Sequence, residues 1–158
     1  MAIIKPNNNT ISAITALPAA ISTGKVLQVV TATDGTQRNT TSTSFVTASN
    51  TLSVDITPSS SSNKIFVICT CTFGSNGNNI AGLGTIYRDS TNLGNANGMM
   101  ANYGNSNRIS GSMSILDSPS TTSSVTYQAY FRQESASGQC DINWNSTKSS
   151  ITAYEIEG

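Results

Sequence analysis

From residue 24 onward the chain alternates apolar and polar positions in short runs, and Gly, Asn, Asp and Ser gather between the runs. A period of two is typical of β-strands, because successive side chains point to opposite faces of a sheet. The longest run, 64–73 (KIFVICTCTF), has apolar residues on both faces: Ile65, Val67, Cys69, Cys71 and Phe73 on one, Phe66 and Ile68 on the other. Such a strand lies in the middle of a sheet. We therefore predict that 64–73 is the central core strand and is covered on both sides.

Shorter runs with the same period flank this strand, and turn residues such as Asp34-Gly35 separate them. The predicted strands are 25–33, 43–48, 51–57, 80–88, 109–116, 125–131, 140–145 and 151–156. Eight or nine short strands with no convincing helix after residue 24 predict an all-β fold. The arrangement we expect is an antiparallel β-sandwich of the jelly-roll kind.

Residues 1–23 differ from the rest, because their apolar side chains recur every three to four residues rather than every two. Pro18 limits any helix there to little more than two turns. The anchoring residues are Ile11, Ile14, Leu17 and Ile21. We divide the chain into an N-terminal arm (1–23) and a β-domain (24–158). The arm either packs on its own domain or docks on another chain, and both interpretations stay open at this point.

The charge is low and balanced, with eight basic and eight acidic residues, so neither nucleic acid nor a membrane surface is predicted as a partner. The chain has no His, which excludes His-based catalysis and His metal ligands. Cys69 and Cys71 fall on one face of the central strand and are predicted to pack in the core, while a bridge from Cys71 to Cys140 remains open. We predict no catalytic site, no metal and no cofactor.

The segment 89–107 is the longest stretch without periodicity, and long loops in compact domains are often functional. Its Tyr103 is the best candidate for contact with a ligand, together with the neighbouring residues Met99, Met100 and Arg108. The stretch DINWN (141–145) begins like a calcium loop, but its sixth position is Ser146 instead of Gly. We predict an ordinary strand there, with Trp144 in the core.

Several stretches resemble a family of small structural proteins of tailed bacteriophages, above all those of marine and freshwater bacteria. They occur in the expected order and cover most of the chain. The matching stretches are IKPNNNTISAITALPAAI, GKVLQVV, TPSSSSNKIFV, YRDST, SILDSPSTTSSVTYQAYFR and SSITAYEIEG. Residues 92–107 carry no pattern of this family.

The resemblance implies a virion protein with a jelly-roll head, a homotrimer similar in outline to tumour-necrosis-factor or C1q heads. The arm would anchor it to other virion proteins of the capsid or tail, and the β-domain would project from the particle. We expect a non-enzymatic capsid decoration or head fibre. The alternative is a tail-fibre tip or a module that binds a host receptor or surface glycan.

Overall fold

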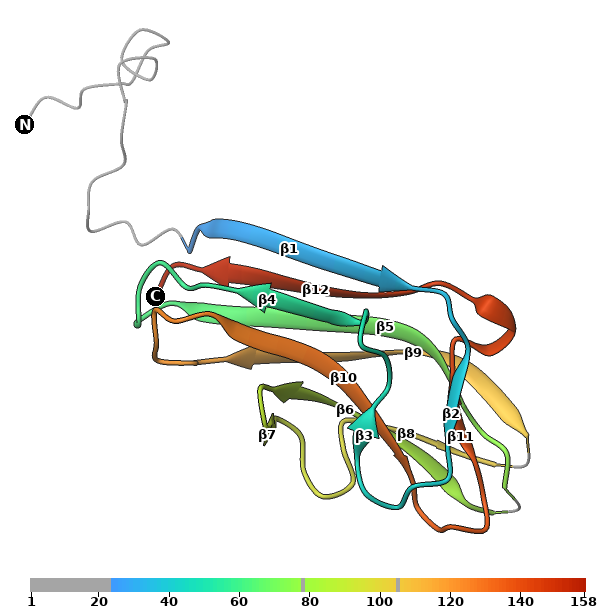
Figure 1. Cartoon of the computed structure of the whole chain (residues 1–158). Helices are drawn as coiled ribbons and strands as arrows, with labels where there is room; N and C mark the ends of the chain where they lie inside the picture. Colours follow the sequence, from blue (N-terminus) through green and yellow to red (C-terminus); the bar gives the residue numbers. More distant parts are fainter. Residues whose placement is uncertain (1–23, 78, 105) are drawn as a thin grey trace, which may run out of the picture.

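The computed structural model describes residues 24–77, 79–104 and 106–158, so the predicted arm residues Ile11, Ile14, Leu17 and Ile21 lie outside the described part of the chain. No helix long and apolar enough to cross a membrane occurs in the described ranges. The elements, labelled in Figure 1, are β1 (Val26–Asp34), β2 (Arg38–Thr40), β3 (Val46–Thr47), β4 (Ser53–Ile56), β5 (Lys64–Ser75), β6 (Ala81–Arg88), β7 (Thr91–Asn92), β8 (Met100–Tyr103), β9 (Asn107–Asp117), β10 (Val125–Gln133), β11 (Cys140–Ile142), the 3-10 turn η1 (Trp144–Ser146) and β12 (Ser149–Ile156).

The strands form two antiparallel sheets that pack face to face (Figure 1). Sheet A has the order β1-β12-β5-β11-β2, with β9 on the other side of β5; sheet B has the order β3-β10-β6-β7, with β4 also beside β10 and β8 beside β6. Three pairs are each one interrupted strand, because both members pair with the same neighbouring strand: β3 with β4, β7 with β8, and β11 with β12. β1 and β2 form a fourth interrupted strand, because they pair with β12 and β11, the two parts of the last one. Counted in this way, eight strands follow the orders 1-8-3-6 and 2-7-4-5. This is a jelly roll, and the predicted fold class is confirmed.

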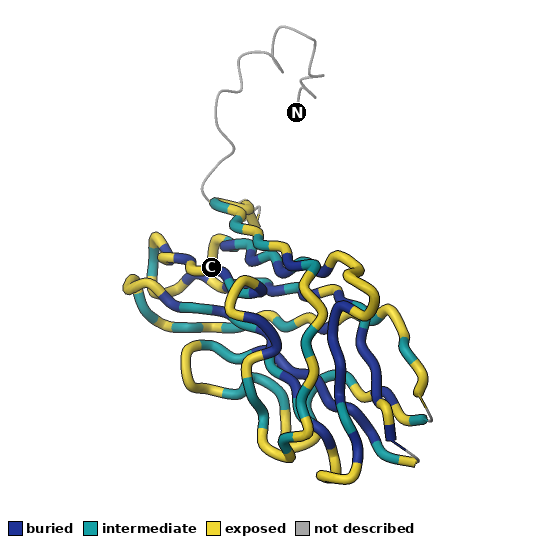
Figure 2. The backbone as a smooth tube through the Cα atoms, turned by 45° about the vertical axis from the view of Figure 1, so that its right-hand side comes forward, coloured by how far each residue is buried: buried dark blue, intermediate teal, exposed yellow. Residues whose placement is uncertain are grey.

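β5 occupies the centre of sheet A, as predicted. It pairs with β12 and β11 along one side and with β9 along the whole of the other. Its inner side chains alternate with its outer ones, and every inner residue from Ile65 to Phe73 is buried. Figure 2 shows the buried segments running through the middle of the sandwich, with the exposed ones at the turns. The three cysteines are free and buried, so the bridge left open between Cys71 and Cys140 is not formed.

The outer face of β5 differs from the prediction. Phe66 and Ile68 are only half-buried, and next to them Leu116 on β9 is exposed. The prediction that the strand is covered on both sides is therefore wrong for the described part of the chain. A single-chain sandwich buries only the inner face of each sheet unless loops fold over the outer one.

The segment 89–107 contains two short strands, β7 and β8, where the sequence showed no periodicity. Both pair with β6 and extend sheet B. Strands of two and four residues are too short to produce a recognisable alternation. The predicted strand 140–145 is also shorter than expected, since β11 ends at Ile142.

Candidate functional site at the two ends of the sandwich

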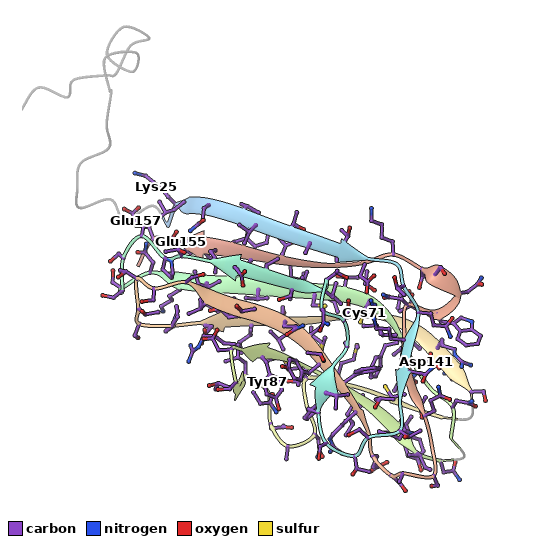
Figure 3. The ribbon with its side chains drawn as sticks, viewed as in Figure 1. Lys25, Cys71, Tyr87, Asp141, Glu155 and Glu157 are labelled. Carbon is purple, nitrogen blue, oxygen red and sulfur yellow. The ribbon has the colours of Figure 1, made fainter. Side chains whose placement is uncertain are left out.

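The described chain begins and ends at the same end of the sandwich, which we call the arm end (Figure 1). A hydrogen bond from the Glu157 N–H to the Lys25 carbonyl (2.9 Å) joins the two segments. Figure 3 shows Lys25, Glu155 and Glu157 together here, whereas Asp141 lies toward the opposite end. Residue 24, which follows the arm in the sequence, therefore lies at the arm end.

A buried carboxylate organises the arm end. Glu155 on β12 is 1% exposed. Its Oε1 accepts hydrogen bonds from the Ser59 N–H (2.6 Å), the Ser59 hydroxyl (2.7 Å) and the Asn63 amide (2.6 Å). Its Oε2 accepts one from the Gln28 amide (2.8 Å) on β1. The Glu155 side chain thus links the loop before β5 to β1 and β12 of sheet A.

These donors determine the charge state of the carboxyl group. Burial alone would raise the pKa of Glu155, but the hydrogen bonds from Asn63, Ser59 and Gln28 lower it from its ordinary value of 4.5 to about 2. Glu155 is therefore ionised at neutral pH, and its charge is satisfied by neutral donors instead of a cation. The four hydrogen bonds hold the Glu155 side chain in place at the arm end.

At the opposite end, which we call the distal end, the chain turns sharply after β11. Asn143, Asn145 and Ser146 all have left-handed backbone angles, with φ of 58°, 54° and 60°. Asn is among the residues that adopt this conformation most readily. The buried Asn143 side chain holds the turn, donating to the Thr36 carbonyl (3.1 Å) and accepting from the Ser149 hydroxyl. As a result Trp144 is 41% exposed, and the prediction that it fills the core is wrong.

Arg108 lies beneath this tryptophan. Its guanidinium is 3.7 Å from the centroid of the Trp144 ring and donates to both carboxylate oxygens of Asp141, at 2.8 and 3.3 Å. The side chain reaches Asp141 by crossing Gly74 of β5, where a β-carbon would come within 2.6 Å of the Arg108 Cγ. Glycine is therefore required at position 74. The pairing of Asp141 with a cation also removes the carboxylate that a calcium loop would need.

The remaining predicted ligand residues have separate surroundings. Tyr103 ends β8 at the distal end of sheet B and is 61% exposed. Met99 and Met100 are half-buried and pack against the core. Beside Tyr103 in the sequence, Ser106 lines an open, polar hollow of about 420 Å³ with Asn76, Gly77, Ile80 and Ser137. A ligand role for Tyr103, Arg108, Met99 and Met100 stays a prediction.

Sequence reasoning missed the arrangement of Trp144, Arg108, Asp141 and Gly74, because it joins three strands that are distant in sequence. One local signal was present. Two asparagines within DINWN favour a turn over a continuing strand.

The buried and half-buried charges of the described chain are satisfied within the protein. Arg38 pairs with Asp34, Arg88 with Asp117 and Arg108 with Asp141. Within residues 24–77, 79–104 and 106–158, no group of three or more Cys, Asp or Glu side chains is placed to hold a metal ion.

The fold defines this chain as a jelly-roll protein. No family model and no curated protein matches it. Among solved structures, the VP2 subviral particle of infectious bursal disease virus is similar, with a TM-score of 0.42 and 14% sequence identity. The similarity covers 81% of this chain and 37% of the VP2 chain, so the chain spans little more than a third of that protein. A likeness at this level defines neither a family nor a function.

The Glu155 network predicts how stability depends on pH. A folded pKa below the ordinary value contributes stability that is present above about pH 4.5 and is lost as the pH falls toward 2. The shift corresponds to about 3 kcal/mol at neutral pH. Glu155→Gln should therefore lower the free energy of unfolding at pH 7 by about that amount, and it should flatten the fall in stability between pH 4.5 and 2. Denaturant unfolding at a series of pH values measures both effects.

Glu157→Gln is the matched control, because Glu157 is exposed and two residues away. Its effect should stay within about 0.5 kcal/mol. Equal losses in the two variants at pH 7 would contradict the role assigned to Glu155.

Proposed function

We propose that this chain is a non-enzymatic structural protein of a bacteriophage virion. In this proposal it is a homotrimeric capsid decoration or head fibre, anchored to other virion proteins by Ile11, Ile14, Leu17 and Ile21 of the arm. The β-domain is displayed on the particle surface. The resemblance of its sequence stretches to small tailed-phage structural proteins supports this assignment, and jelly rolls are common in viral capsid domains.

One observation of the structure supports the proposal most. Residue 24, to which the arm is joined, lies at one end of the domain, and the turn between β11 and β12, which carries the exposed Trp144, lies at the opposite end (Figure 1). A protein attached through its arm therefore presents the distal turns away from its attachment point. The apolar arm residues have no core of their own, which is typical of a segment that docks on another chain.

The arrangement of charges also favours a structural role over an enzymatic one. General acid–base chemistry needs a titratable group open to a substrate and poised near neutral pH. In the described chain, Glu155 accepts four hydrogen bonds and has a pKa of about 2. Asp34, Asp117 and Asp141 are held in ion pairs. A protein of this kind acts by binding and display.

The arm hypothesis predicts a loss of incorporation into particles. Replacing Ile11, Ile14, Leu17 and Ile21 together by Ser in the full-length chain removes the apolar anchors and leaves the β-domain unchanged. Purified particles made with this variant should contain at most about a tenth of the normal copy number, because each lost anchor removes about 1.5–3 kcal/mol of burial. Quantitative mass spectrometry of the particles measures it.

The control replaces four polar residues of the same arm by Ser: Asn7, Asn8, Thr10 and Thr15. Its particles should contain the normal copy number. Normal incorporation of the variant without apolar anchors would refute anchoring by the arm.

A second function, binding of a host-surface glycan, is favoured by the exposed Trp144. Sugar rings stack on aromatic faces, and Arg108 covers one side of this ring. If the distal end binds glycan, Trp144→Ala should weaken retention on host envelope glycans about tenfold, the effect of losing about 1.4 kcal/mol. Thr122→Ala, in an exposed loop, should not change it. Absence of glycan binding by the unaltered protein would rule this function out.

A further inference from the structure

The outer face of sheet A carries a row of apolar side chains that crosses four neighbouring strands, β1, β12, β5 and β9. Val29 on β1 lies opposite Tyr154 on β12, Tyr154 lies opposite Phe66 on β5, and Phe66 lies opposite Leu116 on β9. The two rings are 6.1 Å apart between centroids. Val29 and Leu116, at the ends of the row, are 53% and 52% exposed. Residues opposite one another on one face are in side-chain contact, so the row is continuous.

Neighbouring positions on the same face widen the row into a patch. Ile156 and Val26 lie opposite each other toward the arm end, and Ile68 follows Phe66 along β5. Val26 is 56% exposed. We call these residues the outer patch: Val26, Val29, Phe66, Ile68, Leu116, Tyr154 and Ile156. Around it the face is formed by Ser and Thr, such as Thr31, Thr152 and Ser114.

The outer face of sheet B differs, because residues of β6 on this face are buried. Leu83 and Thr85, which belong to the outer side of β6, are buried because other segments of the same chain fold over them. The Thr85 hydroxyl donates to the Asn92 side chain (2.7 Å), and the Met99 N–H donates to the Gly84 carbonyl (2.8 Å). The segment 92–99 therefore lies along β6 and covers Thr85 on the outer face of sheet B. The outer patch of sheet A has no such cover in the described chain, although β5 has the composition of a strand buried on both faces.

We propose that the outer patch is the surface through which copies of this chain associate. The expected number of copies, three, rests on the function proposed above. The association itself does not require a virion. Aromatic and aliphatic residues surrounded by small polar ones are the usual anatomy of an interface between proteins. In a three-fold oligomer the outer patches of the three copies would meet around the axis, and each patch would contact both neighbouring copies head to tail.

Charge and size both favour a second copy as the occupant. Lys64 is the one charged residue on the outer face of β5, and it stands at the edge beside Ile156. Arg108 and Asp141 lie on the same face beside Gly74 and neutralise each other in an ion pair. A face with few charges, most of them paired, neither repels a copy of itself nor attracts an anionic ligand. Four strands about 4.8 Å apart and about eight residues long give a face of roughly 500 Å² in projection. That is comparable in scale with the about 800 Å² that each partner buries in a standard interface.

The test is the mass of the full-length protein in solution, measured by light scattering after size exclusion at about 100 μM, above the micromolar limit of standard interfaces. The variant carries Val29→Glu and Leu116→Glu, which place like charges at both ends of the row. The control is Tyr103→Glu, which places the same charge at an exposed aromatic residue on sheet B. We expect a trimer for the unaltered protein and for the control, and a single chain for the double variant with an unchanged circular dichroism spectrum.

Should the two glutamates unfold the protein, Val29→Thr with Leu116→Thr keeps good strand formers and should raise the dissociation constant at least about tenfold, the effect of losing about 1.4 kcal/mol of apolar contact. A single chain for the unaltered protein overturns the proposal, and so does a dissociation constant that either folded double variant leaves unchanged. Loss of association on replacing the four arm anchors by Ser, with the patch unaltered, also overturns it, because the arm would then be the contact. An oligomer that depends on the patch but fails to join particles supports the patch and counts only against the virion function.

Discussion

The pairing of β5 on both of its edges is the constraint on which the rest of the structure depends. Its inner side chains, from Ile65 to Phe73, are all 3% exposed or less and form the middle of the core. β12 and β9 are held beside it in continuous register. Because the side chains of a strand alternate, burying this inner row fixes Phe66 and Ile68 on the outer face of sheet A. The same register that builds the core therefore creates the outer patch.

The sequence was sufficient for what depends on local alternation. The long strand at 64–73, the all-β class and the division before Gly24 follow from period, composition and turn residues, and the structure confirms the all-β class and the strand. The sequence was insufficient where the structure depends on pairing between distant segments or on a single backbone angle. β7 and β8 exist because β6 offers them an edge, and Trp144 is exposed because Asn143 turns the chain. The contact of Arg108 with Asp141 requires three strands to be in register across Gly74, which no single run of sequence reveals.

The features available for contact lie on the surface of a domain whose buried charges are held in ion pairs or hydrogen bonds. Glu155 stabilises the arm end by accepting four hydrogen bonds, and the Arg108 pair stabilises the distal end. Between these ends, the outer face of sheet A presents apolar residues that a solitary domain would be expected to hide. Attachment through the arm, association through the outer patch and display of the distal turns are compatible, because they use different parts of one domain.

The central claim is that the domain is held on a particle by its arm and directs its distal end outward. An electron cryo-microscopy map of the virion to which the proposal assigns this protein tests it most directly. The account predicts three copies of the jelly roll around a shared axis on the particle surface, with residue 24 facing the shell and Trp144 facing the medium. A map in which the distal end with Trp144 contacts the shell, or purified particles that lack the protein, would contradict it.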